Sequence, residues 1–99
     1  MEERGMCEVE KNDTEWSGSY SIGVVRFGQK FVSPPHVQLT ASQEGRPNDW
    51  VGLLCTVLKI TEEYLIIDFD GWKVTAGGVV FCPEVYPGAK CYWTLNGEK

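Results

Sequence analysis

A chain of 99 residues with a formal net charge of −5 is long enough for one domain, which can bury roughly 65% of its unfolded surface in a single two-layer core. The acidic balance and the scattered Lys and Arg side chains exclude non-specific binding to a nucleic-acid backbone or to an anionic membrane surface. No apolar stretch has the length needed to span a bilayer, so we expect no membrane insertion.

The N-terminal segment 1–15 is polar and acidic, and we expect an arm or flexible tail ahead of a single domain over 16–99. Within that domain no window shows helical periodicity, whereas alternating or continuous apolar runs predict strands. The expected strands are 18–27, 36–41, 50–60, 64–69, 79–82 and 90–95. Their regular spacing predicts an all-β fold, a six-stranded antiparallel β-sandwich.

Turn residues separate these strands. Pro34-Pro35 fixes two φ angles and removes two amide donors, so it precedes a strand rather than lying inside a sheet. The polar segment 42–49 is a loop, and Asp70-Gly71 is expected to end the strand 64–69. The strand 50–60 is apolar on both faces, which predicts a central strand or one covered by a second protomer.

The order of aromatic and proline residues resembles the H-type lectin domain, a sugar-binding module. The residues that carry the resemblance are Phe27, Phe31, Pro34, Pro35, Val37, Leu39, Val51, Leu53, Leu65, Ile67, Phe69, Trp72 and Trp93. The resemblance implies a six-stranded sandwich that forms a homo-oligomer, with a trimer favoured. It also implies a glycan ligand of the galactose or N-acetylgalactosamine type, bound between protomers, and an extracellular or virion-associated location.

The expected ligand-binding residues are Trp72, Lys73, Arg46, Trp50 and Asp49. Trp72 would offer a flat apolar surface to a sugar ring, and Trp50 beside the polar loop is a second candidate platform. Lys73 stands where members of the family carry His, and Gly52 stands where they carry a sugar-contacting Arg, so Arg46 in the adjacent loop is the candidate replacement. For each tryptophan, a role in the core or at a subunit seam is the competing interpretation.

Two other functional classes are weighed against a lectin. The first is a structural or assembly module of a viral or phage appendage, or of another extracellular assembly, with the same fold and no sugar site. The second is an enzyme, for which Asp68 and Asp70 on one strand face are the candidate acid–base pair. Neighbouring carboxylates on one strand more often form a solvated face, so we expect no catalytic activity.

The four cysteines form no C-x2-C pair, and with one His in the chain we expect neither a metal site nor a cofactor. Cys55 lies in an apolar run and is expected to be a buried thiol. Cys82 and Cys91 flank a Pro- and Gly-rich stretch and are a candidate disulfide across neighbouring strands, and free structural thiols are the alternative.

Overall fold

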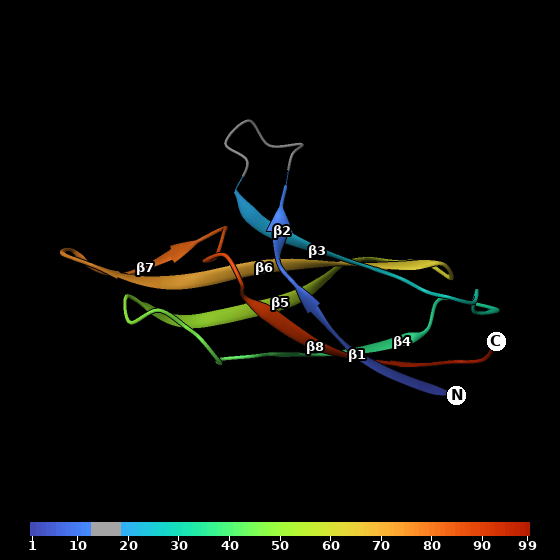
Figure 1. Ribbon diagram of the computed structural model, residues 1–99. Coiled ribbons are helices and arrows are strands. Elements are labelled where there is room, and N and C mark those ends of the chain that lie inside the picture. Colours follow the sequence, from blue (N-terminus) through green and yellow to red (C-terminus); the bar gives the residue numbers. More distant parts are fainter. Residues whose placement is uncertain (13–18) are drawn as a thin grey trace.

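The computed structural model describes residues 1–12 and 19–99, and this part of the chain consists of β-strands, turns and loops (Figure 1). The strands are β1 (Glu2–Glu8), β2 (Glu10–Lys11), β3 (Tyr20–Arg26), β4 (His36–Ala41), β5 (Trp50–Ile60), β6 (Tyr64–Thr75), β7 (Gly78–Cys82) and β8 (Lys90–Asn96). Within the described ranges, no helix has the length and apolar character needed to cross a membrane.

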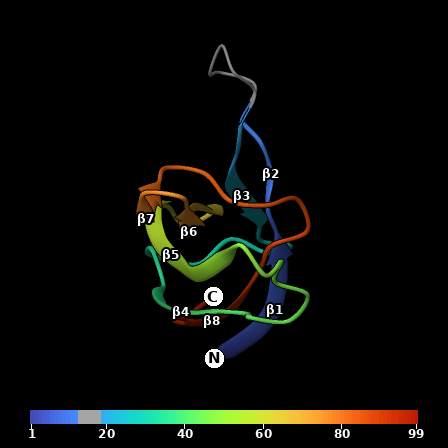
Figure 2. The same ribbon diagram turned by 90° about the vertical axis from the view of Figure 1, so that its left-hand side faces the viewer.

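The strands form two antiparallel sheets that lie one above the other (Figure 2). The smaller sheet has the order β1-β8-β4, and the larger has the order β2-β3-β6-β5. β7 pairs with the C-terminal half of β6, on the same edge that β3 occupies along the N-terminal half. The all-β, sandwich-like architecture expected from the alternating apolar runs is therefore confirmed.

The core lies between the two sheets. Its residues of 0% exposure are Phe31, Leu65, Ile67, Phe69, Ala89, Cys91 and Leu95. Leu65, Ile67 and Phe69 alternate along β6 with half-buried residues, as expected for a strand with one face on the core. Phe31 packs edge-on against Phe27, with ring centroids 5.2 Å apart, so the two phenylalanines before the Pro-Pro corner serve the core.

The N-terminal segment differs from the expected arm or tail. Over residues 2–8 it forms β1, which pairs with β8 along its whole length, from Glu2 opposite Asn96 to Glu8 opposite Lys90. Val9 then carries the chain across to the larger sheet, where β2 begins. The boundary expected between residues 15 and 16 lies outside the described residues.

The described ranges thus contain two strands beyond the six expected, and β6 also runs further than predicted. Asp70-Gly71 does not end this strand, which continues to Thr75 and pairs with β5 on one side and β7 on the other. Gly71 is a strand residue because the ring of Trp50 occupies the space where its side chain would be: a Cβ there would lie 2.6 Å from Trp50 Cζ3. The chain instead turns after Thr75, whose side-chain hydroxyl donates to the Gly78 carbonyl at 3.1 Å.

The candidate disulfide between Cys82 and Cys91 is absent, and all four cysteines are free thiols. Cys82 lies on β7 in the larger sheet, opposite Gly71, whereas Cys91 lies on β8 in the smaller sheet, opposite Cys7. The two strands are therefore not neighbours, because the loop between them crosses from one sheet to the other. The thiol that contacts Cys91 is Cys55, whose pKa is raised by a hydrogen bond to the Cys91 sulfur and by burial.

Candidate functional site

Four of the five expected ligand-binding residues meet where the loop before β5 reaches β6. The ammonium of Lys73 lies 3.6 Å from the Asp49 carboxylate and 5.6 Å from the centre of the Trp50 ring. Arg46 donates a hydrogen bond to the Trp50 carbonyl, and the Val74 amide donates to the Asp49 carbonyl at 2.7 Å. These contacts attach the loop to the sheet, and they already engage the polar groups that were expected to bind a ligand.

Trp50 itself is buried, with 8% of its surface exposed. Its ring covers Gly71 on the inner face of β6 and packs edge-on against Tyr86, with ring centroids 5.7 Å apart. With Lys73 also over the ring, neither face of the indole is free for a sugar. Trp50 is therefore a core residue, which agrees with the interpretation weighed against an exposed sugar platform.

Trp72 lies on the opposite face of the sheet from Lys73, because successive side chains of a strand point to opposite faces. The indole is half-buried and rests against Gly52 of β5, where an added Cβ would lie 3.0 Å from Trp72 Cε3. On its other side it meets Phe81 of β7 edge-on, with ring centroids 5.4 Å apart, and Phe81 is 52% exposed. The five expected residues thus divide into two groups on the two faces of one sheet.

Two carboxyl groups share the outer face with Trp72. Asp68 and Asp70 precede it at alternate positions of β6, so all three side chains point the same way. Burial, a hydrogen bond that protonated Asp70 donates to the neighbouring Asp68 carboxylate, and the charge of Asp68 raise the pKa of Asp70 from 3.8 to about 6. Near neutral pH this pair therefore offers both acceptor oxygens and, part of the time, an acidic proton.

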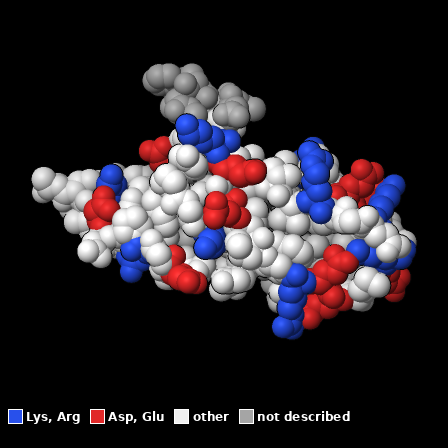
Figure 3. Space-filling model, viewed as in Figure 1, with Lys and Arg blue, Asp and Glu red and all other residues white. Residues whose placement is uncertain are grey.

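Two apolar side chains, those of Leu54 and Phe81, extend the surface that carries Trp72 and the two carboxyl groups. We call the surface formed by Asp68, Asp70, Trp72, Phe81 and the exposed Leu54 the outer face of the larger sheet. Leu54 of β5 lies opposite Asp70 of β6. Beyond this outer face the β6–β7 hairpin projects past the smaller sheet (Figure 1). The tip of that hairpin carries no charged side chain in the view of Figure 3, whereas charges of both signs gather at the end of the molecule near the termini (Figure 3).

No group of three or more His, Cys, Asp or Glu side chains within residues 1–12 and 19–99 is placed to hold a metal ion. Phe81 and Asp70 join Trp72 only through the pairing of β6 with β7 and the extension of β6 past Gly71. The sequence signal for this extension is the presence of two glycines, Gly52 opposite Trp72 and Gly71 beneath the ring of Trp50.

Comparisons with known proteins give no relative. No protein-family model matches the chain, and neither a curated protein nor a solved structure is significantly similar to it.

Proposed function

We propose that this protein is a non-catalytic carbohydrate-binding module of the H-type lectin kind, which binds a glycan on the outer face of the larger sheet. The observation that carries the proposal is the placement of Trp72 beside Asp70, with Phe81 extending the aromatic surface. Aromatic rings provide the apolar surface that the C–H faces of a sugar ring need, and a carboxylate two residues away accepts hydrogen bonds from its hydroxyls.

The sequence resemblance supports the same function and adds expectations about assembly. It favours a ligand of the galactose or N-acetylgalactosamine type, a homo-oligomer, in particular a trimer, and a location outside the cell or on a virion. Weak single sites gain strength when several are presented together, so an oligomer suits a site that consists of one aromatic pair and one carboxyl pair.

A glycan array that compares the parent protein with Trp72→Ala and Tyr92→Ala tests the proposal. Tyr92 is the matched control, because it is an exposed aromatic residue on β8 of the other sheet, 49% exposed. We expect selective glycan binding by the parent and by Tyr92→Ala, and a loss of about tenfold or more in Trp72→Ala, which corresponds to roughly 1.4 kcal/mol. Absence of binding across the array, or equal binding by all three proteins, would rule out a sugar site at Trp72.

A second candidate function is an assembly module without a sugar site, and the composition of β7 favours it. This edge strand, Gly78–Cys82, contains no charged residue, and Val79, Val80 and Phe81 are 61%, 45% and 52% exposed. An exposed apolar edge strand is a template for pairing with another chain. Self-assembly through β7 would bury these side chains without requiring a carbohydrate ligand.

Sedimentation of the parent, Val79→Lys and Val32→Lys separates this candidate from the lectin. Val32 is the matched control, since it is an exposed valine in a loop, 65% exposed. A charge on an edge strand blocks strand pairing, so Val79→Lys would be monomeric if β7 holds the assembly together. An oligomer that persists in Val79→Lys and binds glycans would leave the lectin as the function.

A further inference from the structure

β5 is an edge strand of the larger sheet, although its sequence is apolar on both faces. Among the described residues, β5 pairs with β6 on one side and with no strand on the other. Apart from its ladder with β6, the backbone of residues 51–60 forms no hydrogen bond with another described residue. β4 lies in the smaller sheet and pairs with β8 instead. The structure therefore excludes a central position for this strand, and cover by a second protomer is the expectation that remains.

Both faces of β5 expose apolar side chains beside this open edge. Val51, Leu54 and Val57 are 46%, 40% and 41% exposed. Leu54 lies on the outer face, opposite Asp70, whereas Val57 lies on the other face, opposite Ile67. A molecule that binds flat against one face would leave the side chains of the other face exposed. A strand that pairs with β5 places side chains next to it on both faces.

The open edge of β5 also lacks charge. No residue from Trp50 to Leu58 is charged, in a chain whose formal net charge is −5. Edge strands commonly carry charged side chains, lysine above all, that prevent pairing with another chain. Lys59 is the one charged residue of β5, and it lies beyond an irregularity in the register between Val57 and Lys59. The segment 52–57 is thus a regular edge without this protection.

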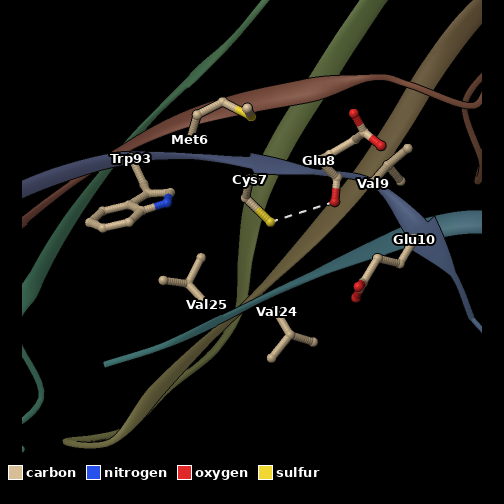
Figure 4. Close-up of a pocket in the computed structure, with 8 residues that line it drawn as sticks. All are labelled: Met6, Cys7, Glu8, Val9, Glu10, Val24, Val25 and Trp93. Carbon is tan, nitrogen blue, oxygen red and sulfur yellow. Dashed lines mark hydrogen bonds between the residues drawn. The ribbon is translucent and has the colours of Figure 1, made fainter. Parts of the chain in front are cut away.

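The opposite edge of the larger sheet is shielded by β1. Val24 and Val25 of β3 face β1 across a cavity of about 310 Å³, which Cys7 and Trp93 also line (Figure 4). A strand added to β3 at this point would therefore meet β1. β7 has an open edge as well, but it has 5 residues, whereas β5 has 11. In the part of the chain that the structure describes, β5 thus offers the longest open edge.

We propose that β5 pairs with β5 of a second copy of this chain, in the antiparallel direction and about a twofold axis near Leu54. The two larger sheets then form one continuous sheet, and the contact is self-complementary, as a twofold interface requires. Antiparallel pairing brings Lys59 toward Asp49 of the partner subunit, whereas parallel pairing would place two lysines side by side. The product is a dimer, a different assembly from the trimer that the resemblance favours. The inference is independent of the proposed glycan site, because Trp72 lies on β6 and Phe81 on β7, away from the open edge of β5.

Sedimentation equilibrium of the full chain tests the proposal. A ladder of about six residues per strand buries less than the roughly 800 Å² per partner of a standard interface, so we expect a dissociation constant in the micromolar range. Between about 1 and 500 µM the parent should rise to twice the mass of the 11.1 kDa chain. Thr56→Lys should weaken this association at least tenfold, because a lysine on an edge strand opposes pairing. Thr56 is exposed and lies opposite Asp68, so the new ammonium has a carboxylate beside it in the monomer.

Thr40→Lys is the matched control, because Thr40 is an exposed threonine on β4, the edge strand of the smaller sheet. We expect Thr40→Lys to dimerise as the parent does, and we expect the same of Val79→Lys on β7. A parent that stays monomeric, equal association of the parent and Thr56→Lys, or dissociation in Val79→Lys alone would overturn the proposal. A monomeric parent that binds glycans would overturn this interface and leave the glycan site standing, whereas a dimer without glycan binding would do the reverse.

Amide hydrogen exchange of the parent provides a test that needs no substitution. In an antiparallel ladder alternate amides point to each side, so part of the amides of 52–57 face the open edge in the monomer. These amides should exchange more slowly at protein concentrations at which sedimentation shows the dimer than at those at which it shows the monomer. The amides of 36–41 in β4 are the control and should exchange equally at both. A gain in protection confined to β7, or no gain within 52–57, would contradict pairing through β5.

Discussion

The indole of Trp93 lies directly on Gly5, its partner across β1 and β8: a Cβ at Gly5 would stand 2.2 Å from Trp93 Cζ2. The same relationship joins Trp50 to Gly71 and Trp72 to Gly52. In the described part of the chain, three tryptophan rings thus cover glycines on neighbouring strands. Aromatic residues that pack over glycine in this way compensate for the missing side chain and help to fix the register of a sheet.

The first prediction follows from the contact between Trp93 and Gly5. Gly5→Ala should lower the free energy of unfolding by about 1–3 kcal/mol, because the new methyl group displaces a packed ring. Gly28→Ala is the control, since a Cβ at Gly28 meets nothing within 4 Å, and it should leave stability unchanged or raise it by about 0.4–1 kcal/mol. Urea denaturation measures both. Equal stabilities of the two variants would mean that the ring does not lie on Gly5.

The sequence predicts the strands that carry apolar residues and misses β1 and β2, which carry few. The expected strands 36–41, 50–60 and 79–82 agree with β4, β5 and β7 to within a residue at each end. β1 has the sequence EERGMCE, in which charges dominate and only Cys7 is buried. β1 forms because it pairs with β8 along its whole length. Gly5 contributes no apolar side chain and instead leaves the space that the Trp93 ring fills. That role is visible only once the two strands are placed together.

The candidate site could be predicted only in part, for a related reason. The importance of Trp72 can be read from its position after an alternating run, but its neighbours depend on strand pairing across β5, β6 and β7. Phe81, which follows Trp72 by nine residues in the chain, contacts the Trp72 ring from β7. Lys73, adjacent to Trp72 in the sequence, points to the opposite side of the sheet, because adjacent strand residues face opposite sides, and there it binds Asp49 beside Trp50.

The second prediction separates the two tryptophans of β5 and β6 by their effect on stability. Trp50→Ala should cost about 3–5 kcal/mol of unfolding free energy, as expected for a large aromatic residue removed from a core. Trp72→Ala should cost about 1–2 kcal/mol, since its ring is only half-buried. Denaturant titration followed by circular dichroism gives both values. A Trp72→Ala variant that is as unstable as Trp50→Ala would assign Trp72 to the core and remove it as a ligand platform.

The third prediction concerns the dependence of stability on pH. The pKa of Asp70 is raised from 3.8 to about 6 in the folded protein by burial and by the neighbouring Asp68. Between these two pH values the folded state keeps a proton that the unfolded state has lost, so the Asp70 contribution favours folding at low pH and disappears as the pH rises to about 6. Asp70→Asn should therefore be more stable than the parent above pH 6, by less than about 1 kcal/mol because the site is open to solvent.

Urea titrations of the parent and Asp70→Asn at several pH values measure this difference. The gain from the substitution should grow between pH 3.8 and about 6 and then stay constant. Asp68→Asn tests the cause, because it removes the neighbouring charge and should lower the pKa of Asp70, as seen in the titration of its carboxyl carbon signal by NMR. A gain that is the same at every pH would show that Asp70 titrates normally.

The fourth prediction concerns the cysteines. Cys91 is 0% exposed and Cys7 is 7% exposed, whereas Cys82 lies on the open β7 edge and is half-buried. A maleimide should therefore label Cys82 first, and it should reach Cys7 and Cys91 only when the protein unfolds, since burial also keeps the Cys7 thiol protonated with a pKa of about 11. Mass mapping of labelled peptides gives the order, and Cys82→Ser should remove the fast phase. A non-reduced peptide that links Cys82 to Cys91 would contradict the arrangement of the two sheets, because it requires β7 and β8 to lie side by side.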